Sequence, residues 1–157
     1  MSCSVFLSYS THDLEKAVRL KQTLEKQPEP RFSVFMAETA VKVGEPLVDR
    51  IKDAIHRCDF FVLLWSPNSK ESAWVQQEIG HANSLGKTVF PIVLEKDLDL
   101  PAFISHLKYL PAYKGEEEVN RWVTTELSET AKEMSTRKFV ILLLLVSLLI
   151  LVLVKME

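Results

Sequence analysis

The sequence predicts an α/β domain built on a flavodoxin-like, doubly wound and mostly parallel sheet. Three short runs rich in β-branched and aromatic residues, at 4–7, 60–65 and 88–94, are apolar on both faces, which is typical of strands covered by helices on both sides. Helical patterns alternate with these runs, and that order requires right-handed crossovers between parallel strands. The 157 residues suffice for one domain with a substantial core.

The first strand, at 4–7, is followed by a predicted helix at about 12–26. Ser10 followed by Asp13 resembles a capping box at the start of this helix, and Pro28 lies just past its end. The inner face of the helix is predicted to consist of Leu14, Ala17, Val18 and Leu24.

A fourth apolar run, at 31–36, alternates slightly more and is predicted to form a strand nearer the edge of the sheet. The stretch 36–46 that follows is longer than a crossover requires, which is the usual mark of a lid or a contact surface. A second helix is predicted at about 46–57, and Pro46 suits its first turn. Its buried face is predicted to consist of Leu47, Val48, Ile51, Ala54 and Ile55.

The third strand, at 60–65, is predicted to place Phe60 and Trp65 in the core. A third helix is predicted at about 72–85, ending before Gly86 at the position of a left-handed cap.

After the strand at 88–94 the pattern weakens. We expect a short helix at 101–106 and a brief last strand near 108–110. A final helix is predicted to begin at about Glu116, because the acidic triplet 116–118 suits a helix N-terminus, and to continue without a break into the C-terminal segment.

The C-terminal run FVILLLLVSLLILVLV, at 139–154, contains a single polar residue, Ser147. As a helix it would be about 24 Å long, a little short of a hydrocarbon core of roughly 30 Å, and Lys138 and Lys155 could snorkel to cover the difference. We expect a membrane span, with a buried hairpin or an oligomer core as the alternative. Arg137 and Lys138 precede the run and only Lys155 follows it, so the N-terminal domain is expected in the cytoplasm. The expected organisation is a domain at 1–115, a juxtamembrane helix at 116–138 and a single-pass tail anchor at 139–155.

Composition argues against several classes of function. The net charge of −2 gives no basic excess for a nucleic-acid partner. The two cysteines form no CxxC pair and the four histidines have no metal-ligand spacing, so neither a metal nor a bound cofactor is expected. A GxGxxG motif, a P-loop and a nucleophile elbow are also missing from the sequence. Carboxylates are the remaining candidates for chemistry.

Four ordered motifs resemble a TIR domain of the prokaryotic kind. They are VFLSYSTHD at 5–13, VFMAETAVKVGEPLVDRIKDAI at 34–55, CDFFVLLWSPNSKESAWVQQEIGHA at 58–82 and GKTVFPIVL at 86–94. A strand followed by SY, a loop that ends in Gly, SPN after the third strand and WxxxE on the third helix occur in the family's order and spacing. The resemblance covers about residues 4–115.

The resemblance implies one of two roles, because many TIR domains associate as signalling modules and a large subset cleaves NAD at the nicotinamide glycosidic bond. In the enzymes the WxxxE glutamate is the catalytic carboxylate, which is Glu78 in this sequence. The chemistry agrees, since departure of nicotinamide leaves a ribosyl oxocarbenium ion that a nearby carboxylate stabilises. Nicotinamide leaves as a neutral molecule, so no paired general acid is required. NAD would be the substrate.

Further site residues follow from the resemblance. The pocket would be lined from the first loop by Ser8, Tyr9, Ser10 and Thr11. Some family enzymes carry basic residues just after SY, but this sequence has Ser10 and Thr11, so the resemblance assigns no phosphate contact here. Glu38 lies about one position from a loop carboxylate that some members use, and Trp74 is expected either to pack on the domain or to stack on nicotinamide. Related domains meet through the long loop at 36–46, and a neighbouring protomer completes the site.

The predicted function is that of a membrane-anchored NAD glycohydrolase or cyclase that is activated by self-association and, by family analogy, serves prokaryotic antiphage defence. Confinement to a membrane would raise the effective concentration for self-contact. One alternative is a non-catalytic module that recruits TIR partners to the membrane, with Glu78 as a solvated helix charge. The other is a membrane-disrupting effector in which TIR assembly drives the span to oligomerise.

Overall fold

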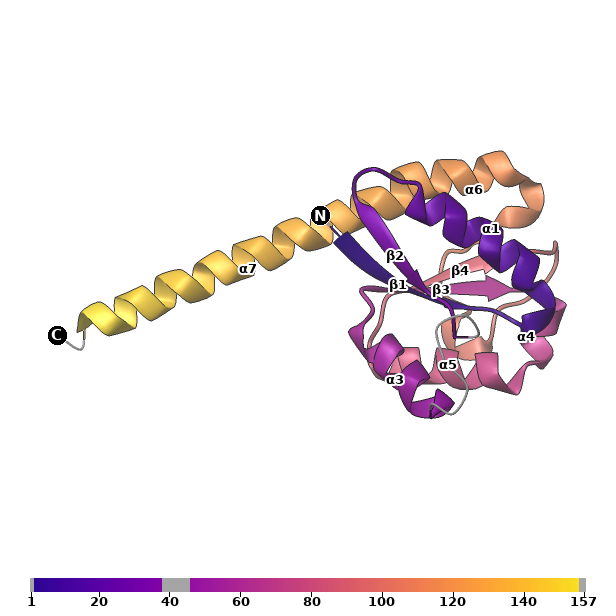
Figure 1. Cartoon of the computed structure of the whole chain (residues 1–157), viewed down its shortest axis with the longest axis horizontal. Coiled ribbons are helices and arrows are strands. Elements are labelled where there is room, and N and C mark those ends of the chain that lie inside the picture. The colour runs from indigo at the N-terminus through magenta and orange to yellow at the C-terminus, as the bar shows by residue number, and fades with distance from the viewer. Residues whose placement is uncertain (1, 38–45, 156–157) are drawn as a thin grey trace.

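The molecule is built around a parallel sheet with the strand order β2-β1-β3-β4-β5 (Figure 1). The structure is a computed structural model that describes residues 2–37 and 46–155, with side chains described up to residue 147. Its strands are β1 (Ser2–Ser8), β2 (Arg31–Phe35), β3 (Phe60–Trp65), β4 (Val89–Val93) and β5 (Leu110–Pro111). Each neighbouring pair is parallel, which confirms the predicted doubly wound α/β class.

The helices follow the predicted order, with ends that differ by a few residues. They are η1 (Thr11–Asp13), α1 (Leu14–Glu25), α3 (Leu47–Arg57), α4 (Pro67–Glu71), α5 (Ala73–Ser84), η2 (Ala102–Ile104), η3 (Ala112–Lys114), α6 (Glu116–Trp122), η4 (Val123–Leu127) and α7 (Ser128–Lys155). The sequence analysis missed α4, which Ser66 caps by accepting a hydrogen bond from the Ser69 amide at 3.0 Å. The helix α5 ends at Ser84, and Gly86 follows it with a left-handed φ of 63°, at the predicted cap position.

Two predicted inner faces are partly wrong. Leu14, Leu47 and Val48 are between 39% and 44% exposed, although each matches the helical apolar period. All three lie in the first two residues of α1 or α3. Deeper in these helices the pattern holds.

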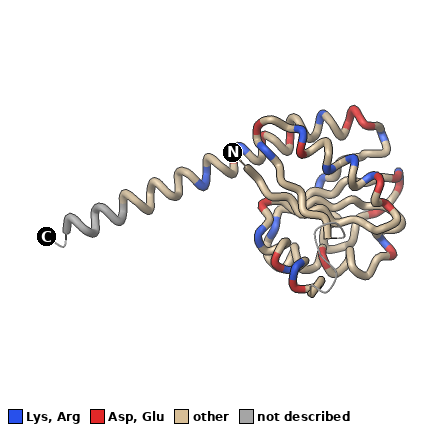
Figure 2. The backbone as a smooth tube through the Cα atoms, in the orientation of Figure 1, with Lys and Arg blue, Asp and Glu red and all other residues tan. Residues whose placement is uncertain are grey.

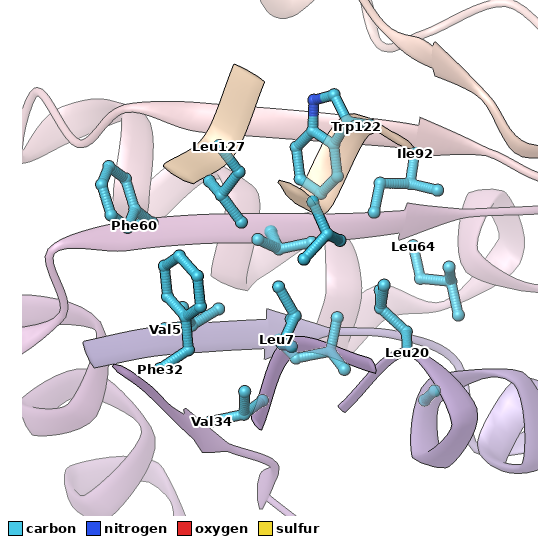
Figure 3. Packing of buried hydrophobic residues seen from close by; sticks show 14 of the residues in the cluster. Val5, Leu7, Leu20, Phe32, Val34, Phe60, Leu64, Ile92, Trp122 and Leu127 are labelled. Atoms are coloured by element: carbon cyan, nitrogen blue, oxygen red, sulfur yellow. The ribbon is translucent and has the colours of Figure 1, made fainter. Parts of the chain in front are cut away.

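Helices cover both faces of the sheet and create two cores. On one face α1 and the helix formed by α6, η4 and α7 cover strand residues shown in Figure 3, among them Val5, Leu7, Phe60, Leu64 and Ile92. On the other face α3 and α5 cover Phe6, Phe61, Leu63, Trp65 and Val93. Phe6 stacks between Phe35 and Phe61, with ring centroids 5.5 and 5.4 Å apart. Phe60 and Trp65 are buried, as predicted.

The outer edge of β2 is occupied by side chains of α1. Lys21 Nζ donates to the Val34 carbonyl at 2.8 Å, and the Val34 amide donates to Glu25 Oε1 at 3.1 Å. Lys21 and Glu25 also pair with each other at 2.7 Å. Backbone groups that an edge strand leaves open to another strand are therefore satisfied within the domain at Val34.

The chain from Glu116 to Lys155 is helical throughout, as expected, but includes a π-helical turn. In this turn, η4, Ser128 Oγ donates to the Val123 carbonyl at 2.7 Å, five residues back. The extra residue allows Trp122 and Val123 as well as Leu127 to face the sheet. The segment expected to be a juxtamembrane helix thus contributes buried side chains to the core.

The last contact between α7 and the domain is an ion pair at the amino ends of the strands. Lys138 Nζ lies 2.6 Å from Asp59 Oδ1, while Asp59 Oδ2 accepts from the Ser4 amide and hydroxyl at 2.8 and 2.9 Å. These contacts hold the pKa of Asp59 below its usual value, against the effect of burial. Beyond Lys138, α7 projects away from the domain without charged residues as far as Ser147 (Figure 2).

The expected membrane span at 139–155 is not supported by the structure. Within the residues searched, which are those that the structure describes, no helix has the length and apolar character needed to cross a membrane. The side chains of 148–154, part of the expected span, lie outside the described residues. The cytoplasmic placement of the domain stays a prediction.

Substitution Leu127→Ala tests whether the C-terminal helix is part of the domain. Because Leu127 is fully buried in the core, we expect the free energy of unfolding to fall by about 2–5 kcal/mol. Leu142→Ala is the matched control on the same helix, since Leu142 is exposed and its loss should change stability by less than about 0.5 kcal/mol. Urea unfolding followed by circular dichroism measures both; equal effects would contradict the assignment of η4 to the core.

Candidate active site

The carboxyl end of β1 places a hydroxyl against α5. Side chains alternate along a strand, so Ser8 lies on the same face as Phe6, under α3 and α5, while Leu7 lies on the opposite face. Ser8 is buried, and its Oγ donates a hydrogen bond of 2.5 Å to Glu78 Oε2. A residue at the end of a strand thus meets one that follows it by 70 positions in the chain.

Glu78 lies in the buried stripe of α5. Ser72 caps the helix by accepting from the Val75 amide, and the stripe then consists of Val75, Glu78, Ile79 and Ala82. Three of these are apolar, and Glu78 occupies the remaining place with only 7% of its surface exposed. The alternative in which Glu78 is a solvated helix charge is therefore wrong.

Burial raises the pKa of the Glu78 carboxyl to about 7, from an ordinary value of 4.5. The hydrogen bond from Ser8 acts in the opposite direction, because it stabilises the charged form. Near neutral pH the carboxyl can therefore be ionised or protonated. A carboxylate with little water around it interacts strongly with any positive charge that develops beside it.

The first loop is tied to the loop after β3 by a second buried carboxylate. Asp13 Oδ2 accepts from Ser66 Oγ at 2.5 Å, and Asp13 Oδ1 accepts from Asn68 Nδ2 at 3.2 Å. Ser10 caps η1 by accepting from the His12 amide at 3.4 Å. The expected capping box is thus only half right, because Asp13 serves the neighbouring loop instead.

The structure brings some of the predicted site residues together and separates others. Ser8 and Glu78 are in contact. Tyr9 and Ser10, which follow Ser8 in the chain, are also buried. Thr11 is exposed. Trp74, one turn before Glu78, is 47% exposed, so the rest of its surface is covered by the domain. Stacking on nicotinamide stays a prediction. Glu38 lies outside the described residues.

Sequence reasoning missed the Asp13 network, although two signals for it were present. Asp13 and the SPN motif both follow interior strands, and the carboxyl ends of parallel strands meet at one edge of the sheet. The pairing of Ser66 and Asn68 with Asp13 follows from that rule. What the rule does not give is which side chains reach each other.

A cavity of about 560 Å³ opens elsewhere, between α1 and α6. It is lined by apolar Leu20, Leu64, Ile92 and Val119 and by charged Lys16 and Glu116, among others. This cavity lies on the face of the sheet opposite to α5 and contains no part of the Ser8–Glu78 pair. Across 2–37 and 46–155 no cluster of three or more His, Cys, Asp or Glu residues could hold a metal ion.

Comparison with known proteins assigns the chain to a family. Residues 5–125 match the TIR domain family. The chain is similar to the NAD(+) hydrolase ApTIR of Actinoplanes sp., with 36% identity over 88 residues; the match covers 52% of this chain and 12% of that protein. The present chain therefore spans only a small part of the length of that relative.

Two solved structures share the fold. The TIR domain of the Toll-related receptor TRR-2 from Hydra magnipapillata has a TM-score of 0.67 and 20% identity, covering 82% of this chain and 97% of that one. The CMP N-glycosidase BcmB from Clostridium botulinum has a TM-score of 0.55 and 22% identity, covering 77% of this chain and 98% of that one. With the strand order, the ordered motifs and the family match over residues 5–125, the chain belongs to the TIR domain family.

Proposed function

We propose that the protein hydrolyses NAD at the bond between nicotinamide and ribose, with Glu78 as the catalytic carboxylate. The observation that carries this proposal is the buried carboxylate held by Ser8 at the carboxyl edge of the sheet. Ligands of open parallel sheets bind at this edge. The similarity to a protein named NAD(+) hydrolase supports NAD as the substrate.

For this reaction an anionic group matters more than a general acid. The nicotinamide ring of NAD is positively charged and leaves as a neutral molecule, taking the electrons of the glycosidic bond with it. Positive charge then develops on the ribose, where the ionised Glu78 carboxylate would stabilise it. Water adds to the ribose carbon and releases a proton to solvent, which gives ADP-ribose.

The location of Glu78 favours a functional role over a structural one. An apolar side chain would complete the stripe of α5 without desolvating a charge, whereas a carboxylate there is costly to ionise. Side chains that break a local folding rule without an evident gain in stability are expected at functional sites. The raised pKa is the measure of that cost.

Self-association is the proposed switch for this activity. The loop at 36–46, through which we expect copies to meet, falls largely on 38–45 and so lies outside the described residues. A role in antiphage defence rests on the family resemblance and stays a prediction, as does the choice between a linear and a cyclic product.

Incubation of the full-length protein with NAD tests the proposal directly. We expect release of nicotinamide, measured by liquid chromatography, and a loss of at least about 100-fold in Glu78→Gln, which keeps the shape of the side chain but not its charge. Glu71→Gln, which removes an exposed carboxylate of α4, is the matched control and should retain activity. Absence of release from the parent protein at high concentration would refute NAD hydrolysis.

The pH dependence of that activity follows from the state of Glu78. Because the ionised form is the active one and its pKa is about 7, kcat/KM should rise with pH through about 7 and level off above it. Initial rates measured over roughly two pH units on either side of the midpoint test this. A profile that is flat through pH 7 would mean that another group carries the reaction.

As pH rises, the stability of the folded protein should fall, whereas the activity should rise. Between pH 4.5 and about 7 the folded protein retains a proton that the unfolded chain releases, so the parent loses stability as pH rises through this window. Glu78→Gln lacks this penalty and should be more stable than the parent at pH 8, by up to about 3 kcal/mol, with the difference vanishing near pH 4.5. Urea unfolding at the two pH values measures it; a destabilised Glu78→Gln at pH 8 would show that the charge supports the fold.

A further inference from the structure

The two oxygens of the Glu78 carboxylate have different surroundings. Oε2 accepts the hydrogen bond from Ser8 Oγ, and Oε1 accepts none from the residues that the structure describes. Over the same residues, no buried side-chain oxygen lacks a partner. Oε1 is therefore the oxygen that still reaches solvent, and the one that can meet a substrate.

We propose that Ser8 is a positioning residue, whose hydroxyl holds Glu78 Oε2 inside the domain and thereby presents Oε1 to the ribose of the substrate. This proposal rests on the proposed NAD hydrolysis for the identity of the substrate, and on the hydrogen bond for the contact. Ser8 itself is buried and lies on the interior side of the carboxylate, so it does not need to touch NAD.

Among the residues that the structure describes, the pair has few ionisable neighbours. The helix α5 packs against α3, α4 and the strands β1, β3 and β4, and these strands carry no ionisable side chain other than the buried thiol of Cys3 at the far end of β1. All ionisable side chains of α3 are exposed, namely Asp49, Arg50, Lys52, Asp53, His56 and Arg57, and so are Lys70 and Glu71 of α4. On α5 itself His81 is half-buried, and in η1 Asp13 is engaged by Ser66 and Asn68.

Burial and the Ser8 hydroxyl are accordingly the two influences on the pKa of Glu78. Removal of the hydroxyl leaves Oε2 buried with no donor, which disfavours the ionised form further. In Ser8→Ala the fraction of protein with an ionised Glu78 at neutral pH should fall. In Ser8→Thr the hydroxyl is kept and the fraction should be restored.

The molecule offers a matched control for this change. Ser66 Oγ donates to Asp13 Oδ2 at 2.5 Å, the same length as the bond from Ser8 to Glu78, and both serines are buried at carboxyl ends of neighbouring strands. Ser66→Ala thus removes a serine–carboxylate bond of the same length, together with the cap of α4, without touching Glu78. Any loss that arises only from a weakened fold should appear in both alanine variants.

The test is the pH profile of NAD hydrolysis by the full-length protein. In Ser8→Ala we expect the acid limb of kcat/KM to move up by about one pH unit, which is about a tenfold loss of rate below the new midpoint. Ser8→Thr should return the limb to the position of the parent, and Ser66→Ala should leave it there. An unmoved limb in an active Ser8→Ala variant would overturn the positioning role.

A second measurement does not depend on catalysis. The carboxyl carbon of Glu78, assigned by its disappearance in Glu78→Gln, can be titrated by NMR in the parent and in Ser8→Ala. A titration midpoint of Glu78 that rises in Ser8→Ala supports the positioning of Glu78 by Ser8, and an unchanged midpoint overturns it. If the midpoint rises but no nicotinamide is released by the parent, the contact is upheld and NAD hydrolysis is what fails.

Discussion

Coverage of the sheet on both faces is the constraint on which this structure depends. Because helices cover both sides of β1, its residues 5–8 are all buried, and a polar side chain at the end of the strand needs a partner inside the domain. Ser8 has that partner in Glu78. The same constraint makes Glu78 acceptable on the buried stripe of α5, since one of its oxygens is satisfied by the strand.

Two buried carboxylates lie at the carboxyl edge of the sheet and have different partners. Asp13 accepts from Ser66 and Asn68, which follow β3, and so joins the segments that follow two neighbouring interior strands, β1 and β3. Glu78 accepts from a single hydroxyl and keeps an oxygen toward solvent. Both oxygens of Asp13 are engaged within the domain, while Glu78 keeps one oxygen available for chemistry. Geometry alone makes this distinction, since both residues are acids in a buried setting.

The strands and the class of fold could be predicted because runs without alternation have few other places in a soluble domain than a covered parallel sheet. The inner faces of α1 and α3 were harder, since Leu14, Leu47 and Val48 fit the helical period but lie in the first turn of their helices and are exposed. The π-helical turn left no sequence signal that hydrophobic spacing could reveal.

The candidate site could be named from the sequence to the level of single residues but not of atoms. Glu78 was named from the WxxxE resemblance, yet its burial, its contact with Ser8 and the exposure of Trp74 depend on how α5 is rotated on the sheet. Rotation of a helix by one position reverses such contacts. The Asp13 network was missed for the same reason, because it depends on which side chains reach across two loops.

The ion pair of Lys138 with Asp59 has a practical consequence for work on this protein. The first strand begins and the C-terminal helix departs at the same pole of the domain (Figure 1), while the Ser8–Glu78 pair occupies the other. A fluorophore, purification handle or surface tether joined to either terminus would therefore lie at the end of the domain opposite to the Ser8–Glu78 pair. Immobilised through its tail, the domain would present the edge that holds this pair outward.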